Sequence, residues 1–356
     1  MSNTFNYPPA FGILSRLPRT ELFSGPTPLE PMPNLARACD AGNLLVKRDD
    51  CTHLAFGGNK VRQLEFYFGE ALAQNADTVL ITGAVQSNFV RLAAAAAAKL
   101  VMQCHVQLEE RVDKTDPMYH LSGNVLLDKL FGAKMYSYDE GEDEFGADRK
   151  LREIADALEQ EHGRKTYIIP LAPNHKPLGA LGYMVAAQEL LEQIESANIR
   201  VDEVVLGSGS GSTHGGMLFG LRALGSSITV RGICVRRDAS VQKPRIEKRC
   251  QEIADLLEMK NPVTNDDVIT EDDFYKPGYG KLNAATNEAI LLAARKEGLV
   301  LDPTYTGKVM AGFIHRAREA DKGKTLVFLH SGGTPSLFAY QDSIIAAANH
   351  ADETPS

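Results

Sequence analysis

The chain has 356 residues, more than the roughly 100–200 of an average domain, so we expect it to form two lobes. Its formal net charge is -8 and its Lys and Arg residues form no basic stripe, which excludes nucleic acid as a partner. The scattered single cysteines, the missing leader pattern and the absence of an apolar run of about 20 residues predict a cytoplasmic protein with reduced thiols, no metal and no membrane contact.

Short β-rich runs alternate with amphipathic helical patterns along the chain. Strands are predicted at residues 44–47, 78–82, 104–107, 134–138, 166–169, 203–206, 228–234 and 325–329. Helices are predicted at residues 60–74, 124–131, 148–160, 180–194, 283–297 and 308–317, and the acidic segment at residues 138–146 is interpreted as a solvated loop. This alternation is typical of an α/β protein with open, mostly parallel sheets flanked by helices, which bind ligands at the carboxyl ends of their strands.

A lysine opens the first long helical pattern directly behind two glycines, in the segment AFGGNKVRQLEF at residues 55–66. A lysine on an ordinary helix is most often a solvated surface charge. Behind Gly57 and Gly58, however, we expect room for a flat ring beside Lys60, and burial there would lower the pKa of its amine. Lys60 is therefore a candidate nucleophile.

Three polar side chains, Gln86, Ser87 and Asn88, follow the strand predicted at residues 78–82 and precede an alanine-rich helical pattern. Ser or Asn at such a position can simply cap the helix. Three polar groups at the carboxyl end of a strand can also bind a carboxylate, so both interpretations stay open.

A segment rich in Gly and Ser, GSGSGSTHGG at residues 207–216, joins an apolar strand to an apolar helical pattern. Converging N–H groups, hydroxyls and the positive end of a helix suit a phosphate, with Gly209, Ser210, Gly211, Ser212 and Thr213 as candidate ligands. The segment matches neither GxGxxG nor GxxxxGK[ST], so a single phosphate is favoured. A flexible linker is the alternative, although linkers seldom join a buried strand to an apolar helix.

Two tyrosines lie in loops bounded by Gly and Pro: Tyr279 in PGYG and Tyr305 in DPTYTGK. Each is either a packing residue or a proton carrier. A further glycine loop, HSGG at residues 330–333, follows the last predicted strand. A phosphate cradle combined with a lysine at a glycine turn indicates pyridoxal phosphate, whose aldehyde condenses with a neutral amine.

Over roughly residues 20–345 the chain resembles a family of pyridoxal-phosphate enzymes that contains D-cysteine desulfhydrase, 1-aminocyclopropane-1-carboxylate deaminase and L-cysteate sulfo-lyase. This family is a branch of the tryptophan-synthase-β-like, fold type II group. The motifs that carry the resemblance are KRDD, FGGNKVRQLEF, GAVQSN, GNVLLD, LGALGY, GSTHGG, PGYG, LDPTYTGK and HSGGTPSLFAY.

The resemblance implies a role for each candidate residue. Lys60 would hold the cofactor as an imine and carry the α-proton, and Asn88 would bond the phenolic oxygen of the ring. The substrate carboxylate would contact Gln86, Ser87 and Asn88, and residues 209–213 would bind the phosphate. Ser87, Tyr279 and Tyr305 would belong to the catalytic group, with Thr306 and Ser331 beside the cofactor.

The resemblance also implies a homodimer that acts on a small amino acid, with the cofactor between two lobes. The larger, cofactor-binding domain would comprise residues 1–62 and 175–356. The smaller, inserted α/β domain would comprise residues 63–174.

Two positions bear on the reaction. Cyclopropane deaminases carry an acidic residue facing the pyridine nitrogen and a leucine in HxGG, where this chain has Thr306 and Ser331. Ring opening needs strong electron withdrawal through a protonated ring, which a hydroxyl does not support, so β-elimination is favoured. The preferred reaction is D-cysteine to pyruvate, ammonia and sulfide. The alternatives are L-cysteate with release of sulfite, a β-hydroxy or β-chloro amino acid, the cyclopropane substrate, racemisation, and non-catalytic binding of an amino acid or the cofactor.

The chain departs from the family pattern at three places that bear on the substrate. Ser331 stands where D-cysteine desulfhydrases usually have threonine. Phe89 stands where histidine or another polar residue is common, and Gln63 stands where a basic residue usually follows Arg62. A sulfonate substrate would need additional cationic or N–H donors near Cβ, for which Arg91 and His214 are the candidates.

Overall fold

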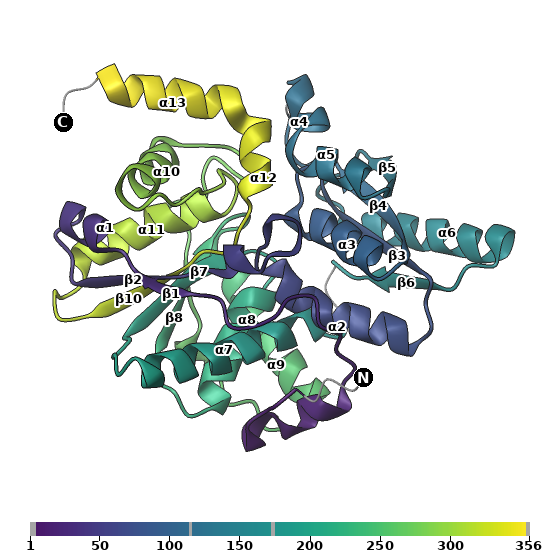
Figure 1. Cartoon of the computed structure of the whole chain (residues 1–356), viewed down its shortest axis with the longest axis horizontal. Helices are drawn as coiled ribbons and strands as arrows, with labels where there is room; N and C mark the ends of the chain where they lie inside the picture. Colours follow the sequence, from purple (N-terminus) through teal and green to yellow (C-terminus); the bar gives the residue numbers. More distant parts are fainter. Residues whose placement is uncertain (1–4, 114–115, 172–174, 354–356) are drawn as a thin grey trace.

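Two β-sheets form the framework of the computed structural model, which describes residues 5–113, 116–171 and 175–353 (Figure 1). In these residues the larger sheet has six strands in the order β1-β2-β10-β7-β8-β9, with β1 antiparallel to β2 and the other pairs parallel. Its strands are β1 (Leu29–Pro31), β2 (Asn43–Lys47), β7 (Glu203–Ser208), β8 (Thr229–Cys234), β9 (Ile269–Glu271) and β10 (Thr325–Leu329). The smaller sheet is parallel, in the order β5-β4-β3-β6. Its strands are β3 (Thr78–Ala84), β4 (Gln103–Glu109), β5 (Lys134–Tyr138) and β6 (Thr166–Ile169).

Helices cover both sheets (Figure 1). The α-helices are α1 (Pro33–Ala38), α2 (Lys60–Ala73), α3 (Asn88–Lys99), α4 (Pro117–Leu121), α5 (Gly123–Leu130), α6 (Glu144–His162), α7 (Leu178–Ser196), α8 (Ser212–Ala223), α9 (Ala239–Leu256), α10 (Ala284–Glu297), α11 (Thr306–Glu319), α12 (Thr334–Leu337) and α13 (Gln341–Glu353). Short 3-10 segments are η1 (Pro9–Arg16), η2 (Asp49–Cys51), η3 (Leu54–Phe56), η4 (Asn265–Asp267) and η5 (Phe338–Tyr340). The predicted α/β class with open, mostly parallel sheets is confirmed.

The smaller sheet is inserted into the chain between β2 and β7 of the larger one. Helix α2 packs against both bodies, since it contacts α7 beside the larger sheet and α3 beside the smaller. The division into residues 63–174 against 1–62 and 175–356 therefore stays a prediction, and its end points at residues 1, 174 and 356 lie outside the described residues.

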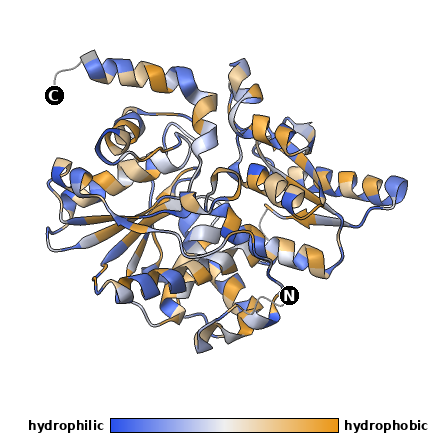
Figure 2. Cartoon of the chain, viewed as in Figure 1, coloured by the Kyte–Doolittle hydropathy of each residue, from blue (hydrophilic) through white to orange (hydrophobic). Residues whose placement is uncertain are grey.

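The larger sheet is buried on both faces, because its strands carry β-branched and aromatic side chains on both sides. Along β10, Leu326 and Phe328 join one hydrophobic cluster, whereas Val327 and Leu329 join another on the opposite face. Successive side chains of a strand point to opposite faces, so helices on both sides must cover such a strand. Figure 2 shows hydrophobic colour along the strands and hydrophilic colour on the outward parts of helices such as α6. In the described part of the chain, no helix is long and apolar enough to cross a membrane.

All predicted strands and helices are present, with ends shifted by a few residues, but β1, β9, α1, α4, α9 and α13 were not predicted. Helix α9 was not predicted for two reasons. Pro244 lies inside it, where a proline removes a backbone hydrogen bond, and most of its residues are polar. Its apolar stripe of Ile246, Cys250 and Ile253 is nevertheless buried in the core, and this packing stabilises the helix.

Candidate active site

A cavity of about 970 Å³, its mouth included, lies where the strands of both sheets end. Its wall includes residues at or just beyond the carboxyl ends of β3, β4, β7, β8 and β10. They are represented by Ala84, Arg111, Gly209, Val235 and Ser331. The cavity thus lies where parallel α/β sheets bind ligands.

Most of the predicted site residues line this cavity. Those that do are Lys60, Ser87, Asn88, Gly209, Ser210, Gly211, Thr213, Tyr279, Tyr305 and Ser331. Three predicted residues, Gln86, Ser212 and Thr306, are not part of its lining. The fold therefore brings segments that are far apart in the sequence to one chamber.

Lys60 is the first residue of α2 and faces the cavity. Burial lowers the pKa of its amine from 10.5 to about 8. No carboxylate in the described residues pairs with it, and its Nζ lies 5.7 Å from the centre of the Phe89 ring. At neutral pH the amine is therefore uncharged far more often than that of a solvated lysine.

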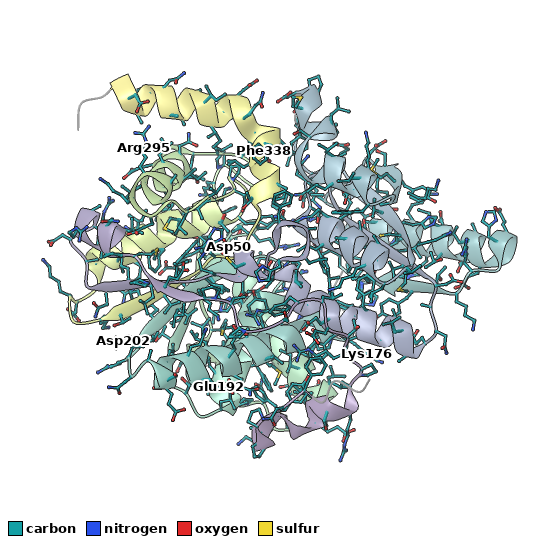
Figure 3. The ribbon with its side chains drawn as sticks, in the orientation of Figure 1. Asp50, Lys176, Glu192, Asp202, Arg295 and Phe338 are labelled. Atoms are coloured by element: carbon teal, nitrogen blue, oxygen red, sulfur yellow. The ribbon has the colours of Figure 1, made fainter. Side chains whose placement is uncertain are left out.

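The glycines before Lys60 serve close backbone packing rather than making room for a ring. Gly57 has φ 62°, and a Cβ there would lie 2.0 Å from the carbonyl oxygen of Asp50, which Figure 3 labels near the middle of the molecule. Gly58 meets the loop after β10, where a Cβ on Gly332 would lie 2.6 Å from the Gly58 Cα. This contact holds the start of α2, and with it Lys60, against the larger sheet.

The phosphate-type loop runs from the end of β7 into α8. Gly211 caps α8 with φ 97°, a left-handed conformation that favours glycine, and the first-turn N–H groups of a helix lack intrahelical partners. Arg245 Nε donates to the carbonyl oxygen of Ser210 at 3.2 Å, which adds a cation beside the loop. The loop thus has the donors and the helix end that an anionic group requires.

Thr213 ties this loop to the lysine helix. Its Oγ1 accepts hydrogen bonds from Asn59 Nδ2 at 2.8 Å and from Gln63 Nε2 at 3.0 Å. Gln63, one of the departures from the family pattern, is therefore a bridge between α2 and α8. Its amide joins the two elements without adding a charge.

Asn88 is held so that its amide nitrogen remains available to a ligand. Its Oδ1 accepts from Asn124 Nδ2 at 2.9 Å and from an Arg91 amine at 3.4 Å. The side chain lines the cavity, and a donor there suits a phenolic oxygen. Ser87 Oγ accepts from the Val90 N–H at 3.3 Å, so Ser87 caps α3 as well as lining the cavity.

Gln86 turns away from the cavity. Its Nε2 donates to the carbonyl oxygens of Tyr119 at 2.6 Å and Ser122 at 3.0 Å, and its Oε1 accepts from the Asn124 N–H at 2.9 Å. The amide is fully used in joining the turn before α3 to α4 and α5. The structure therefore does not bring the Gln86 side chain to the other site residues.

The two predicted tyrosines meet in the cavity wall. The hydroxyls of Tyr279 and Tyr305 are 2.5 Å apart, and burial raises the pKa of both. Lys308 supports this arrangement, because its Nζ donates to the carbonyl oxygens of Tyr275 at 2.6 Å and Gly278 at 2.5 Å. The pair is a protonated hydroxyl couple held between a loop and a helix start.

A carboxylate that sequence reasoning missed, Asp302, lines the wall next to Tyr305. Thr306 donates its hydroxyl to Asp302 Oδ2 at 2.8 Å and its N–H at 3.0 Å, so the Thr306 side chain supports Asp302 rather than facing the cavity. Burial raises the pKa of Asp302, although these hydrogen bonds lower it in part. A comparison of a hydroxyl with a carboxylate at position 306 alone therefore leaves out the carboxylate of Asp302 next to that position.

Charged residues that the sequence reasoning also missed line the cavity. They are Arg111, Arg236, Arg237, Arg245 and Glu144. Glu144 begins α6 with only 12% of its side chain exposed, so the interpretation of residues 138–146 as a solvated loop is wrong for this residue. A signal was present, since Arg236 and Arg237 directly follow a predicted strand, at the edge where ligands bind.

The two donors suggested for a sulfonate do not line the cavity. His214 is fully buried behind the loop, with Nδ1 3.0 Å from Ser208 Oγ, and burial lowers its pKa to about 4. Arg91 donates to Asn124 Oδ1 at 3.1 Å and to the Gly57 carbonyl at 3.2 Å, and burial lowers its pKa to about 9. Both side chains therefore lie behind the cavity wall and do not reach the cavity.

The donor set fits pyridoxal phosphate. A helix N-terminus with a glycine loop suits the phosphate, a buried amine with a lowered pKa suits the aldehyde, and the Asn88 amide suits the ring oxygen. All three face one cavity. The residues that would hold the group are Lys60, Asn88 and the loop at residues 209–213.

Comparison with known proteins agrees with this chemistry. The sequence model of a family described as pyridoxal-phosphate dependent enzyme matches residues 20–332. A crystal structure described as an ACC deaminase homologue is 36% identical, with a TM-score of 0.85, and the match covers 96% of this chain and 100% of that one.

Two more distant structures share the fold alone. A fungal L-serine ammonia-lyase from Rhizomucor miehei is 15% identical with a TM-score of 0.62, over 90% of this chain and 98% of that one. An O-ureido-L-serine synthase is 18% identical with the same TM-score, over 94% of this chain and 98% of that one. The chain belongs to the pyridoxal-phosphate dependent enzymes, in the fold type II family of ACC deaminase and D-cysteine desulfhydrase.

Proposed function

We propose that the chain is a carbon–sulfur lyase that removes a sulfur substituent from Cβ of a small amino acid and releases pyruvate and ammonia. The observation that carries this proposal is the buried amine of Lys60 in the same cavity as the Tyr279–Tyr305 couple. A base and a protonated acid within one chamber are what an α,β-elimination needs. By its motifs the chain resembles D-cysteine desulfhydrase first.

The bound cofactor supplies electron withdrawal, which makes the Cα proton of an attached amino acid acidic. Lys60 Nζ, once free, accepts that proton, because its lowered pKa keeps the amine partly neutral at physiological pH. Asn88 Nδ2 would orient the bound ring by donating to its phenolic oxygen. The Ser87 hydroxyl lines the cavity at the start of α3, next to Asn88, and would contact the substrate carboxylate.

The tyrosine couple acts on the leaving group. Since burial raises the pKa of both phenols, they stay protonated and can donate to a departing sulfur atom. For D-cysteine the C–S bond breaks with its electron pair on sulfur, and water then releases the products. Cysteine and water thus give pyruvate, ammonia and hydrogen sulfide.

A second candidate substrate, L-cysteate, is supported by the arginines of the cavity wall. Four guanidinium groups line the chamber, and a thiol substrate uses none of them. Cysteate and water would give pyruvate, ammonia and sulfite by the same residues.

Parallel assays with D-cysteine, L-cysteine, L-cysteate and 1-aminocyclopropane-1-carboxylate test the proposal. Keto acid, ammonia, sulfide and sulfite are measured for each substrate. Pyruvate with sulfide from a cysteine, or with sulfite from L-cysteate, is expected, and the assay that yields it identifies the substrate. α-Ketobutyrate from the cyclopropane substrate, or no keto acid from any of the four, would contradict β-elimination.

We further propose a cytoplasmic homodimer, with the cofactor between a lobe of residues 63–174 and the rest of the chain. The family resemblance supports the homodimer and the position of the cofactor. Light scattering of the purified protein tests the dimer.

A further inference from the structure

Three arginines of the cavity wall converge on a single carboxylate. Glu144 Oε1 accepts from Arg236 at 2.6 Å and from Arg237 at 2.6 Å, and Arg245 lies 3.6 Å from Glu144 Oε2. The arginines follow or belong to β8 and α9 of the larger body, whereas Glu144 begins α6 of the smaller one. The cluster therefore spans the two bodies at the cavity.

Positive charge exceeds negative charge in this cluster. Apart from Glu144, the only carboxylate that pairs with these guanidinium groups within the described residues is Glu142, whose side chain is 74% exposed and screened by solvent. Arg236 is 9% exposed, and its buried Nε has no hydrogen-bond partner in the part of the chain that the structure describes. Burial raises the pKa of Glu144, but the charges of Arg237, Arg236 and Arg245 lower it overall, so Glu144 is ionised. The three guanidinium groups are half-buried, with 9%, 18% and 17% of their side chains exposed, and their excess over carboxylates leaves donors that suit a further anion.

The cluster lies beside the phosphate-type loop without being part of it. Arg245 contacts the carbonyl oxygen of Ser210, and a Cβ on Gly209 would lie 3.3 Å from Val235, the residue before the arginine pair. The loop already supplies its own N–H groups and a helix end for a phosphate. Arg236 and Arg237 therefore offer donors beyond those that the cofactor requires.

We propose that Arg236, Arg237 and Arg245 form an anion subsite that binds a sulfonate group on Cβ of the substrate. Glu144 holds the three guanidinium groups in place for that sulfonate. This inference rests on the proposed function and names its substrate class. A sulfonate carries three acceptor oxygens, which match several converging N–H donors. The subsite ranks L-cysteate above D-cysteine, whose thiol offers no such acceptors. In the reaction the C–S bond breaks with its electron pair on sulfur, which leaves as sulfite.

The test uses the cofactor-loaded enzyme and two variants, Arg237→Gln and Glu144→Gln. Arg200→Gln is the matched control, because that side chain is 87% exposed and pairs with Asp202 away from the cavity. Binding of inorganic sulfate is measured by calorimetry, independently of turnover. Titration of the cofactor-free proteins with pyridoxal phosphate and the KM values for L-cysteate and D-cysteine complete the set.

We expect Arg237→Gln to weaken sulfate binding by about tenfold and to raise the KM for L-cysteate by more than that for D-cysteine, because one charge-assisted donor pair is lost. Glu144→Gln should also weaken sulfate binding, because an amide holds the three guanidinium groups in place less firmly than the carboxylate does. Arg200→Gln should change neither.

Unchanged sulfate affinity in Arg237→Gln would overturn the subsite. A loss of cofactor affinity with no change in substrate discrimination would also overturn it, because the arginines would then serve the phosphate. If the wild type turns over no sulfur amino acid but Arg237→Gln loses sulfate binding, the anion site stands and the proposed lyase function fails.

Discussion

The lowered pKa of Lys60 leads to a quantitative prediction about attachment of the cofactor. Covalent attachment needs the neutral amine, so its rate should follow the neutral fraction of Lys60. With a pKa of about 8, that fraction rises from about 3% at pH 6.5 to about 97% at pH 9.5, a roughly 30-fold increase that levels off above pH 9. With the ordinary value of 10.5, the same interval would give a roughly 900-fold increase and no plateau.

The assay follows the absorbance of the cofactor after it is mixed with the cofactor-free protein at each pH. The interval begins at pH 6.5 because a phosphate monoester has its second pKa near about 6, so its charge changes little above that value. Lys60→Ala should show no covalent adduct after reduction with borohydride. Lys176→Ala is the matched control, since that side chain is 66% exposed and pairs with Glu70, and it should behave as the wild type.

Two results would refute this reasoning. A rate that continues to rise up to pH 10 would mean that burial does not lower the pKa of Lys60. A borohydride-reducible adduct in Lys60→Ala would mean that another lysine is the nucleophile.

Three further predictions concern the walls of the cavity. Tyr305→Phe should lower kcat by about a hundredfold with little change in KM if the phenol donates to the leaving group, and a kcat within twofold of wild type would assign it to packing. Thr306→Glu should lower both Tm and the β-elimination rate, because it places a second carboxylate beside buried Asp302, and unchanged turnover would contradict the proposed role of this wall. Gly332→Ala should cost at least about 2 kcal/mol of folding free energy, because φ is 88° and the added Cβ would lie 2.6 Å from backbone. Chemical unfolding should show a smaller loss for Gly163→Ala, where φ is also positive but the space is open, and equal losses would argue against the backbone contact.

Several features of the site follow from local sequence, because a glycine-rich turn after an apolar strand and a lysine at a helix start are encoded within a few residues. Lys60, Ser87, Asn88, Gly209 and Ser210 reach the cavity for this reason, since each directly follows a strand or opens a helix of a parallel sheet protein. The α/β class is determined in the same way by the alternation of strands and helices.

The tertiary structure alone decided which side chains turn toward the cavity and which turn away. Gln86 is adjacent to Ser87, yet its amide is used by α4 and α5, and Thr306 hydrogen-bonds to Asp302. These partners are remote or depend on the exact fold of a turn, so no local pattern reveals them.

The charge of the cavity was likewise decided by tertiary structure. Arg111 follows β4, Arg236 and Arg237 follow β8, and Arg245 lies on α9, so no run of basic residues marks them in the sequence. Arg236, Arg237 and Arg245 converge on Glu144, whereas Arg111 pairs with Glu109, and all four meet only because two sheets place the carboxyl ends of their strands around one chamber. The sequence by itself determined the cofactor chemistry through local motifs, whereas the charges that would choose the substrate come from packing between segments that are distant along the chain.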